Sequence, residues 1–122
     1  MDATLDIYTP MTYIYRTMEL VETSIFTRRV SELLSDESYR DLQSALVIRP
    51  EAGAVMPARC GVRKCRWAGS GRGKRGGVRV IHYWVTIQER LLMLYIYPKN
   101  EQDDLTAEQL KALRSIVERE YR

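Results

Sequence analysis

Residues 78–97 read VRVIHYWVTIQERLLMLYIY, two strongly β-prone runs that flank a short polar segment. Residues 78–85 and 91–97 are rich in branched and aromatic side chains, and residues 86–90 have the length and polarity of a hairpin connection. The second run is apolar on both faces, as is typical of a central strand covered by helix on at least one side. This stretch therefore predicts a β-hairpin at the centre of a sheet with helical cover.

The segment before this hairpin has the alternation of a third strand. In residues 62–68, Lys64 and Arg66 share one face, while Arg63 and Cys65 share the other. Successive side chains of a strand point to opposite faces, so the pattern predicts that two cations project side by side from this strand.

Helical periodicity lies nearer the N-terminus, after residues 13–21, which suit an extended strand. In residues 24–34 the apolar side chains recur on one helical face. They are Phe26, Val30, Leu33 and Leu34. Ser35, followed by two acidic residues, is an N-cap signal for a second helix, which Pro50 ends. These residues predict a helical hairpin.

A last helix begins at the capping-box residues Thr106 and Gln109. Its inner face continues with Leu113, Val117 and Tyr121. The order β-α-α-β-β-β-α predicts an α+β domain with an antiparallel sheet, an N-terminal helical hairpin and a C-terminal helix. Residues 1–17 show no clear period, so we expect an N-terminal extension there and one domain over residues 18–122.

Basic residues are concentrated in the middle of the chain. Residues 59–79 hold eight of the 19 Lys and Arg residues, six of the seven glycines and none of the 16 acidic residues. A cationic backbone segment of this flexibility is suited to a polyanion, and RNA is the partner we expect. The alternative is a solvated basic loop that binds nothing.

Composition excludes several other classes of protein. The apolar content of 45% and the charged content of 29% are ordinary for a globular domain. No apolar run approaches the roughly 20 residues that span a bilayer, and Asp2 and Asp6 lie where a secretory signal carries positive charge, so we expect a cytoplasmic protein. Cys60, Cys65 and His82 give at most three soft ligands, so we expect reduced thiols, no metal site and no cofactor.

Four motifs in this order resemble the HigB branch of the RelE/ParE toxin superfamily. They are GVRKCRW at 61–67, GRGKRGG at 71–77, VRVIHY at 78–83 and IYPKNE at 96–101. The resemblance covers residues 18–121. It implies a RelE-like fold, a toxin of a type II toxin–antitoxin system that cleaves messenger RNA on the ribosome, contact with ribosomal RNA, and a helix-turn-helix antitoxin encoded beside it.

The sequence departs from the pattern of these relatives at three places. Arg59-Cys60-Gly61 stands where the branch has a glycine pair before its arginine-lysine motif, and Asn100 stands where RelE has an arginine. No tyrosine occupies the start of the final helix. The resemblance therefore does not carry over the acid–base scheme of RelE as a whole.

Cleavage of RNA can use the substrate's own 2′-hydroxyl as nucleophile, so the protein needs neither a metal nor a side-chain nucleophile. Its task is to stabilise the extra negative charge of the phosphorane, which arginine and lysine do well when a strand holds them. If the predicted strands pair, four cations meet on one sheet face: Lys64, Arg66, Arg79 and Lys99. Tyr97 is the fifth candidate catalytic residue, to orient the nucleotide or stack on a base, with a core-edge tyrosine as the alternative.

The other candidates receive different interpretations. We expect four residues to grip phosphate: Arg63, Arg72, Lys74 and Arg75. His82 faces away from Arg79 in its strand, which favours a packed structural histidine over an acid–base role. An acidic group is explained by the dipole of the last helix: Asp103, Asp104 and Glu108. Two other functions stay open, a ParE-like inhibitor of DNA gyrase and a non-catalytic RNA-binding module.

Overall fold

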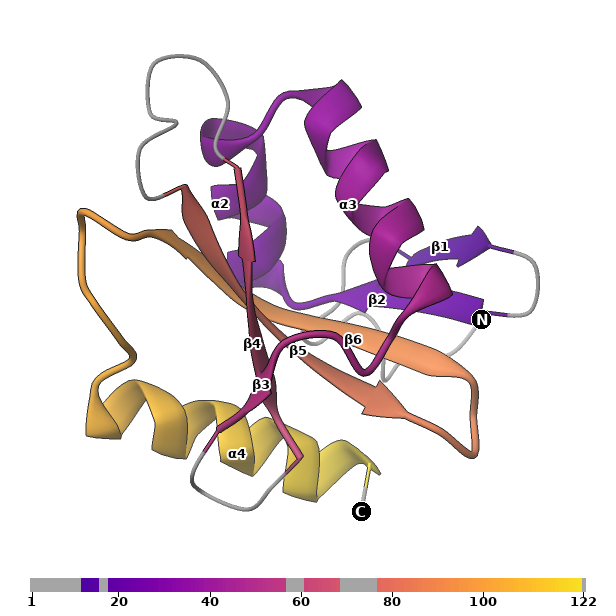
Figure 1. The fold of residues 1–122 in the computed structure, drawn as a ribbon. Coiled ribbons are helices and arrows are strands. Elements are labelled where there is room, and N and C mark those ends of the chain that lie inside the picture. Colours follow the sequence, from indigo (N-terminus) through magenta and orange to yellow (C-terminus); the bar gives the residue numbers. More distant parts are fainter. Residues whose placement is uncertain (1–11, 16–17, 57–60, 69–76, 122) are drawn as a thin grey trace.

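The computed structural model describes residues 12–15, 18–56, 61–68 and 77–121. In this part of the chain, six strands form one sheet in the order β1-β2-β6-β5-β4-β3. The strands are β1 (Thr12–Tyr15), β2 (Met18–Glu22), β3 (Ala54–Val55), β4 (Arg63–Trp67), β5 (Val78–Val85) and β6 (Arg90–Pro98). The helices are α2 (Ser24–Leu33), α3 (Asp36–Ile48) and α4 (Ala107–Tyr121). Helices α2 and α3 cover one face of the sheet and α4 covers the other (Figure 1).

Strand β6 is buried on both faces, as its apolar sequence predicts. Seven consecutive residues, 91–97, are buried. Toward α2 and α3 the strand contributes Leu91, Met93 and Ile96. Toward α4 it contributes Leu92, Leu94, Tyr95 and Tyr97. The sheet therefore separates two apolar cores, and β6 takes part in both.

The predicted hairpin is present, since β5 and β6 pair antiparallel along their length, and β4 pairs antiparallel with β5. The ladder between β5 and β6 is irregular at one place, where Ile81 pairs with Tyr95 but the next residue, His82, pairs with Met93. One residue of β6, Leu94, is thus extra, as in a β-bulge. The bulge lets Leu94 and Tyr95 join the same apolar core.

The α+β class is confirmed, but the prediction of an antiparallel sheet is wrong for one strand pair. Strand β2 runs parallel to β6, with Glu19 opposite Arg90 and Glu22 opposite Met93. Parallel neighbours need a long connection, and here it runs through both helices and three further strands. The hydrophobic pattern of a strand is the same in either direction, so only this connection decides the orientation.

The N-terminal strand also differs from the prediction. Residues 13–21 were expected to form one strand, but Tyr13 pairs with Leu20 and Tyr15 with Met18, so β1 and β2 are antiparallel neighbours. Strand β1 lies within the segment expected to be an extension, residues 1–17. The two-residue strand β3 was not predicted, because so short a pairing has no periodicity of its own.

The predicted helix starts are confirmed by their caps. The Ser35 hydroxyl accepts a hydrogen bond from the Ser38 amide at 3.0 Å. At α4, the Gln109 amide donates to Thr106 and the Thr106 amide donates to the Gln109 side chain, both at 3.0 Å, which completes the capping box. In the described part of the chain, no helix is long and apolar enough to cross a membrane.

Thr23 caps α2 and also joins it to β6. Its hydroxyl accepts a hydrogen bond from the Phe26 amide at 3.1 Å and donates one to the Leu94 carbonyl at 2.8 Å. The residue is buried. A buried carbonyl without a donor is costly, so the hydroxyl stabilises both the helix end and the bulged strand.

Replacing Thr23 by valine keeps the shape of the side chain but removes both hydrogen bonds. We expect the free energy of unfolding to fall by about 2–3 kcal/mol, of which about 1 is the cap and the rest the unsatisfied Leu94 carbonyl. Urea denaturation measures the change. Thr23→Ser should retain most of the stability, and Ser24→Ala, at the exposed neighbouring position, is the control. A loss below about 0.5 kcal/mol in Thr23→Val contradicts this account.

Candidate functional site

The register of three strands places predicted site residues directly opposite one another. Arg66 of β4 is paired with Arg79 of β5, and Arg79 is paired with Tyr97 of β6. Lys64 lies two residues before Arg66 and therefore on the same face, as the alternation predicts. This is the face that α4 covers, since Tyr97 packs in the core on that side.

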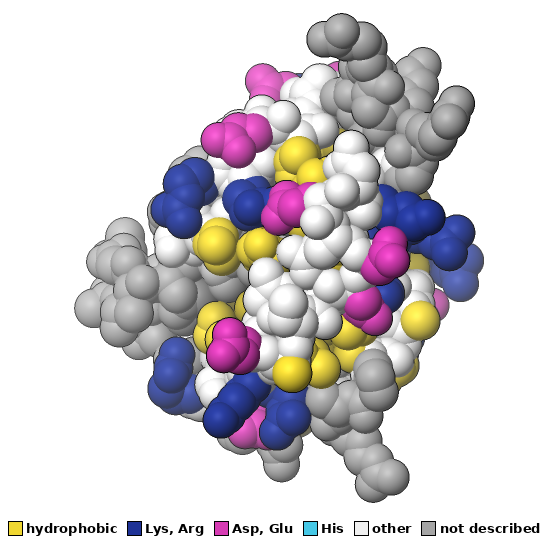
Figure 2. Space-filling view, turned by 90° about the vertical axis from the view of Figure 1, so that its left-hand side faces the viewer, with side chains coloured by type: hydrophobic (Ala, Val, Ile, Leu, Met, Phe, Trp, Pro, Cys, Tyr) yellow, Lys and Arg dark blue, Asp and Glu magenta, His cyan; other side chains and the backbone are white. Residues whose placement is uncertain are grey.

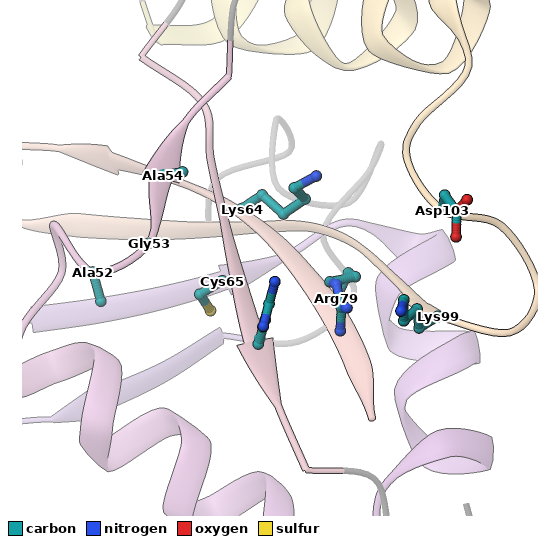
Figure 3. A pocket seen from close by; sticks show the side chains of 9 residues that line it. Ala52, Gly53, Ala54, Lys64, Cys65, Arg79, Lys99 and Asp103 are labelled. Atoms are coloured by element: carbon teal, nitrogen blue, oxygen red, sulfur yellow. The ribbon is translucent and has the colours of Figure 1, made fainter. Parts of the chain in front are cut away.

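A pocket of about 790 Å³ opens where these strands meet the loop after β6. It is lined by Ala52, Gly53, Ala54, Lys64, Cys65, Arg66, Arg79, Lys99 and Asp103. Its volume is in the range of ligand-binding sites. Figure 3 shows Lys64, Arg79 and Lys99 coming from β4, β5 and the end of β6, with Asp103 on the loop beyond them. The fold thus brings together the four cations that the sequence predicts for one sheet face.

The cations of the pocket differ in how firmly they are held. Arg79 is only 6% exposed, and its guanidinium donates to the Val78 carbonyl at 3.4 Å. The neighbours of Arg79 in the strand, Val78 and Val80, are buried in the core beneath α2 and α3. Arg66 and Lys99 are exposed. The pocket therefore combines one preorganised guanidinium with more adaptable charges at its rim.

Tyr97 lies in the core and not in the wall of the pocket. The side chain is 0% exposed, and its hydroxyl has no hydrogen-bond partner among the described residues. Burial, together with the negative charge of Asp104, raises the pKa of Tyr97 to about 12 against the opposing charge of Arg79. The hydroxyl is protonated at neutral pH and is a potential donor. The buried ring matches the core-edge alternative and offers no free face for a base.

Two acidic residues belong to the site, and the sequence interpretation missed them. Asp103 lines the pocket, and Asp104 accepts a hydrogen bond from Lys64 at 3.1 Å. Partial burial alone raises the pKa of Asp104, but the hydrogen bonds from Lys64 and the Leu105 amide and the charge of Lys64 together hold it below its usual value. The pocket thus contains an internal counter-ion.

The helix-dipole explanation is therefore incomplete for these two residues, because Asp104 also pairs with Lys64 and Asp103 lines the pocket. Helix α4 begins at Ala107, and its only acidic residue in the first turn is Glu108. Asp103 and Asp104 precede the helix, in the loop that returns past β4. Their closeness in sequence to Lys99 was the one available signal of their place at the site.

The residues predicted to grip phosphate are not gathered by the described structure. Arg63 lies on the opposite face of β4 from Lys64 and donates to the Gly53 carbonyl at 3.2 Å. The other three lie outside the described residues: Arg72, Lys74 and Arg75. On the side of the molecule that carries the loop between β6 and α4, basic side chains lie beside acidic ones, and the described residues there form no continuous basic surface (Figure 2).

Gly53 forms a wall of the pocket that no larger residue could form. Its φ is +90°, and a Cβ at this position would lie 2.5 Å from the Lys64 carbonyl oxygen. A glycine is therefore required for β3 and the residue before it to pass close to β4. This close passage brings Ala52 and Ala54 to the pocket beside Lys64.

His82 lies on the face away from the pocket, as its position in β5 predicts. The ring is 0% exposed, and Nε2 lies 3.3 Å from the Pro50 carbonyl. Burial lowers the pKa of His82 to about 4, opposed by the Pro50 carbonyl and reinforced by the charge of Arg63. Cys65 is a free thiol whose pKa burial raises to about 11, so it is protonated at neutral pH. Cys60 lies outside the described residues.

One comparison with known proteins bears on this site. Residues 23–121 match a family model described as the RelE toxin of the RelE/RelB toxin–antitoxin system. The match extends from the cap of α2 to the end of α4 and includes every residue that lines the pocket. It confirms the superfamily indicated by the motifs, while the HigB-like branch stays a prediction.

The buried neutral His82 makes stability depend on pH. Its pKa is lowered from 6.5 to about 4 in the folded protein, so between these values only the unfolded chain binds the proton. Folding stability is therefore complete above pH 6.5 and decreases as the pH falls toward 4. From pH 7 to pH 5 this group alone should remove about 2 kcal/mol.

His82→Gln cannot titrate, so its loss of stability between pH 7 and pH 5 should be smaller than that of the wild type by this amount. Urea denaturation at the two pH values measures the difference, in which any pH-independent effect of the substitution cancels. Equal pH dependence in both proteins contradicts a buried neutral histidine.

Proposed function

Because the chain belongs to the RelE family of toxins from toxin–antitoxin systems, we propose that it is an endoribonuclease that cleaves messenger RNA on the ribosome and thereby inhibits translation. The observation that carries the proposal is the group of four cations around one pocket: Lys64, Arg66, Arg79 and Lys99. Two of them, Arg66 and Arg79, are directly opposite on neighbouring strands. Like charges in that position destabilise a sheet, and an anionic ligand such as a phosphodiester would offset their repulsion.

The chemistry assigned to the pocket is attack of a 2′-hydroxyl on the adjacent phosphorus, with departure of the 5′-oxygen of the next nucleotide. The nonbridging oxygens gain negative charge in the transition state, and preorganised donors aimed at them lower the barrier most. Arg79 suits this role because it is buried and its strand is fixed. Arg66 and Lys99 are more exposed, and we propose that they add to this charge stabilisation from the rim of the pocket.

The remaining residues of the site receive narrower roles. Tyr97 is proposed to support Arg79, which it faces on the neighbouring strand, and not to contact the RNA itself, because its side chain is buried in the core. In the protein without RNA, Asp104 forms an ion pair with Lys64. This ion pair is partly exposed and worth at most about 1 kcal/mol, so an incoming phosphate can displace it.

The proposed partners follow from the family and from the charge. They are the messenger and ribosomal RNA, and an antitoxin with a helix-turn-helix encoded next to the gene, which would neutralise the toxin in the cytoplasm. Residues 59–79, with eight basic and no acidic residues, supply most of the expected electrostatic attraction to RNA.

We expect that production of the chain without its antitoxin stops growth and creates new 5′ ends within translated messages. Mapping of 5′ ends after induction is the measurement, with the Arg79→Ala variant as the inactive control. Growth arrest with intact messages and gyrase-linked DNA breaks would replace the proposal by the ParE-like function. Normal growth and intact messages, despite RNA binding by the purified protein, would favour the non-catalytic module.

Chemistry and binding can be separated by single-turnover cleavage of ribosome-bound message at saturating toxin, because saturation hides losses of affinity. Arg79→Ala should lose about 3–4 kcal/mol of transition-state stabilisation, roughly a 100- to 1,000-fold decrease in rate, by analogy with loss of one oxyanion donor. Lys64→Ala and Arg66→Ala should fall in the same class. Lys74→Ala should mainly weaken binding.

Two matched variants guard this comparison. Arg79→Lys keeps a buried cation and should stay folded, so a slower rate in this variant reflects loss of the guanidinium and not loss of folding. Circular dichroism checks that each variant is folded. His82→Gln changes the opposite face of the same strand and should retain substantial activity. If His82→Gln abolishes cleavage while Arg79→Ala retains it, the active face has been assigned to the wrong side of the sheet.

A further inference from the structure

Strand β6 extends beyond the end of its neighbour β2, and the donors along this edge come from α2. The last paired residue of β2, Glu22, lies opposite Met93, whereas β6 continues to Pro98. Past that point, the Thr23 amide donates to the Met93 carbonyl at 3.1 Å and the Thr23 hydroxyl donates to the Leu94 carbonyl at 2.8 Å. The N-terminal end of α2 thus supplies hydrogen-bond donors to β6 where β2 ends.

Arg29, further along α2, also donates to this edge of β6 and reaches the loop after β6. Its Nε donates to the Ile96 carbonyl at 2.8 Å, and its Nη2 lies 2.6 Å from a carboxylate oxygen of Glu101. The guanidinium also stacks over the ring of Tyr95, with 5.1 Å between its central carbon and the ring centroid. Contacts on three sides fix the orientation of a planar guanidinium, which a lysine amine cannot reproduce.

The segment between the two hydrogen-bonded partners of Arg29 carries Lys99. The amide of Lys99 donates to the Gly77 carbonyl at 3.0 Å, and the amide of Glu101 donates to the Pro98 carbonyl at 3.0 Å. The turn is thus closed by its own backbone, while Arg29 holds it at both ends, at Ile96 and at Glu101. Lys99 is the pocket cation that this turn presents.

We infer that Arg29 is a positioning residue for the pocket, which acts by fixing the turn that carries Lys99. Arg29 does not line the pocket, and nothing in its contacts brings it to a bound phosphate. The ion pair with Glu101 is partly exposed on both sides, so its contribution to the stability of the whole fold is small. The main effect of Arg29 is instead on the placement of Lys99, and small misplacements of a charged group reduce catalysis strongly.

The inference rests on the proposed function for the role of Lys99, and a double-mutant comparison tests it. Arg29→Met should slow single-turnover cleavage of ribosome-bound message by about tenfold in the wild-type background and cause no further loss in the Lys99→Ala background. Arg29→Lys should not restore the rate, because one amine cannot hold both Ile96 and Glu101. Arg28→Met, at the exposed neighbouring position of the same helix, is the matched control and should leave the rate unchanged.

Two kinetic results would overturn the inference. One is an unchanged rate in Arg29→Met. The other is an equal loss in the wild-type and Lys99→Ala backgrounds, because a general structural defect slows both while a residue that acts through Lys99 slows only the first.

Amide hydrogen exchange of the full chain tests the same contact without reference to activity. In Arg29→Met, the amides of Lys99 and Glu101 should exchange at least several-fold faster, while the melting temperature and the exchange of β5 amides change little. Unchanged protection at Lys99 and Glu101 overturns the inference even if the protein cleaves RNA. If the wild type cleaves no RNA, the proposed function fails, and faster exchange at these two amides still supports the turn-fixing role of Arg29.

Discussion

Burial of β6 on both faces is the constraint around which the other elements are arranged. A strand with seven consecutive buried residues requires cover from two sides, and α2 with α3 supply one cover and α4 the other. A central strand also needs a neighbour at each edge. β5 fills one edge, and β2, followed by Thr23 and Arg29, fills the second. The Thr23 hydroxyl connects the cap of α2 to the bulged residue Leu94 of this strand.

The candidate site depends on the same strand, because the register against β6 determines which side chains meet. Pairing of Arg79 with Tyr97 and of Arg66 with Arg79 places a row of polar groups on the sheet face that packs against α4. The clustered cations oppose folding, and Asp104 partly neutralises them. We interpret this local loss of stability as the consequence of keeping a preformed phosphate site, since functional sites are where proteins depart from rules that favour stability.

Local signals in the sequence were sufficient for most elements. The bounds of β5, the caps at Ser35 and Thr106, and the alternation that puts Lys64 and Arg66 on one face all agree with the structure. Each depends on residues close in sequence, through hydrogen bonds within one helical turn or through the period of a strand. The same alternation along β5 predicts from the sequence that His82 and Arg79 point to opposite faces of the sheet, since successive side chains of a strand alternate.

The sequence by itself thus determined the α+β class, the helix starts, the central hydrophobic strand and the set of cations that form the pocket. Only the tertiary structure decided the parallel pairing of β2 with β6, the reversal between β1 and β2, and the places of Asp103 and Asp104 beside Lys64. It also decided the reach of Arg29 across to β6 and Glu101. The physical reason for most of these contacts is their range: periodicity and capping are set within a few residues, whereas the pairs β2–β6, Lys64–Asp104 and Arg29–Ile96 join positions 40 and more residues apart. Their meeting depends on how the helices pack on both faces of β6. The reversal between β1 and β2 is local, but residues 13–21 are β-prone throughout, so the sequence pattern shows no break there.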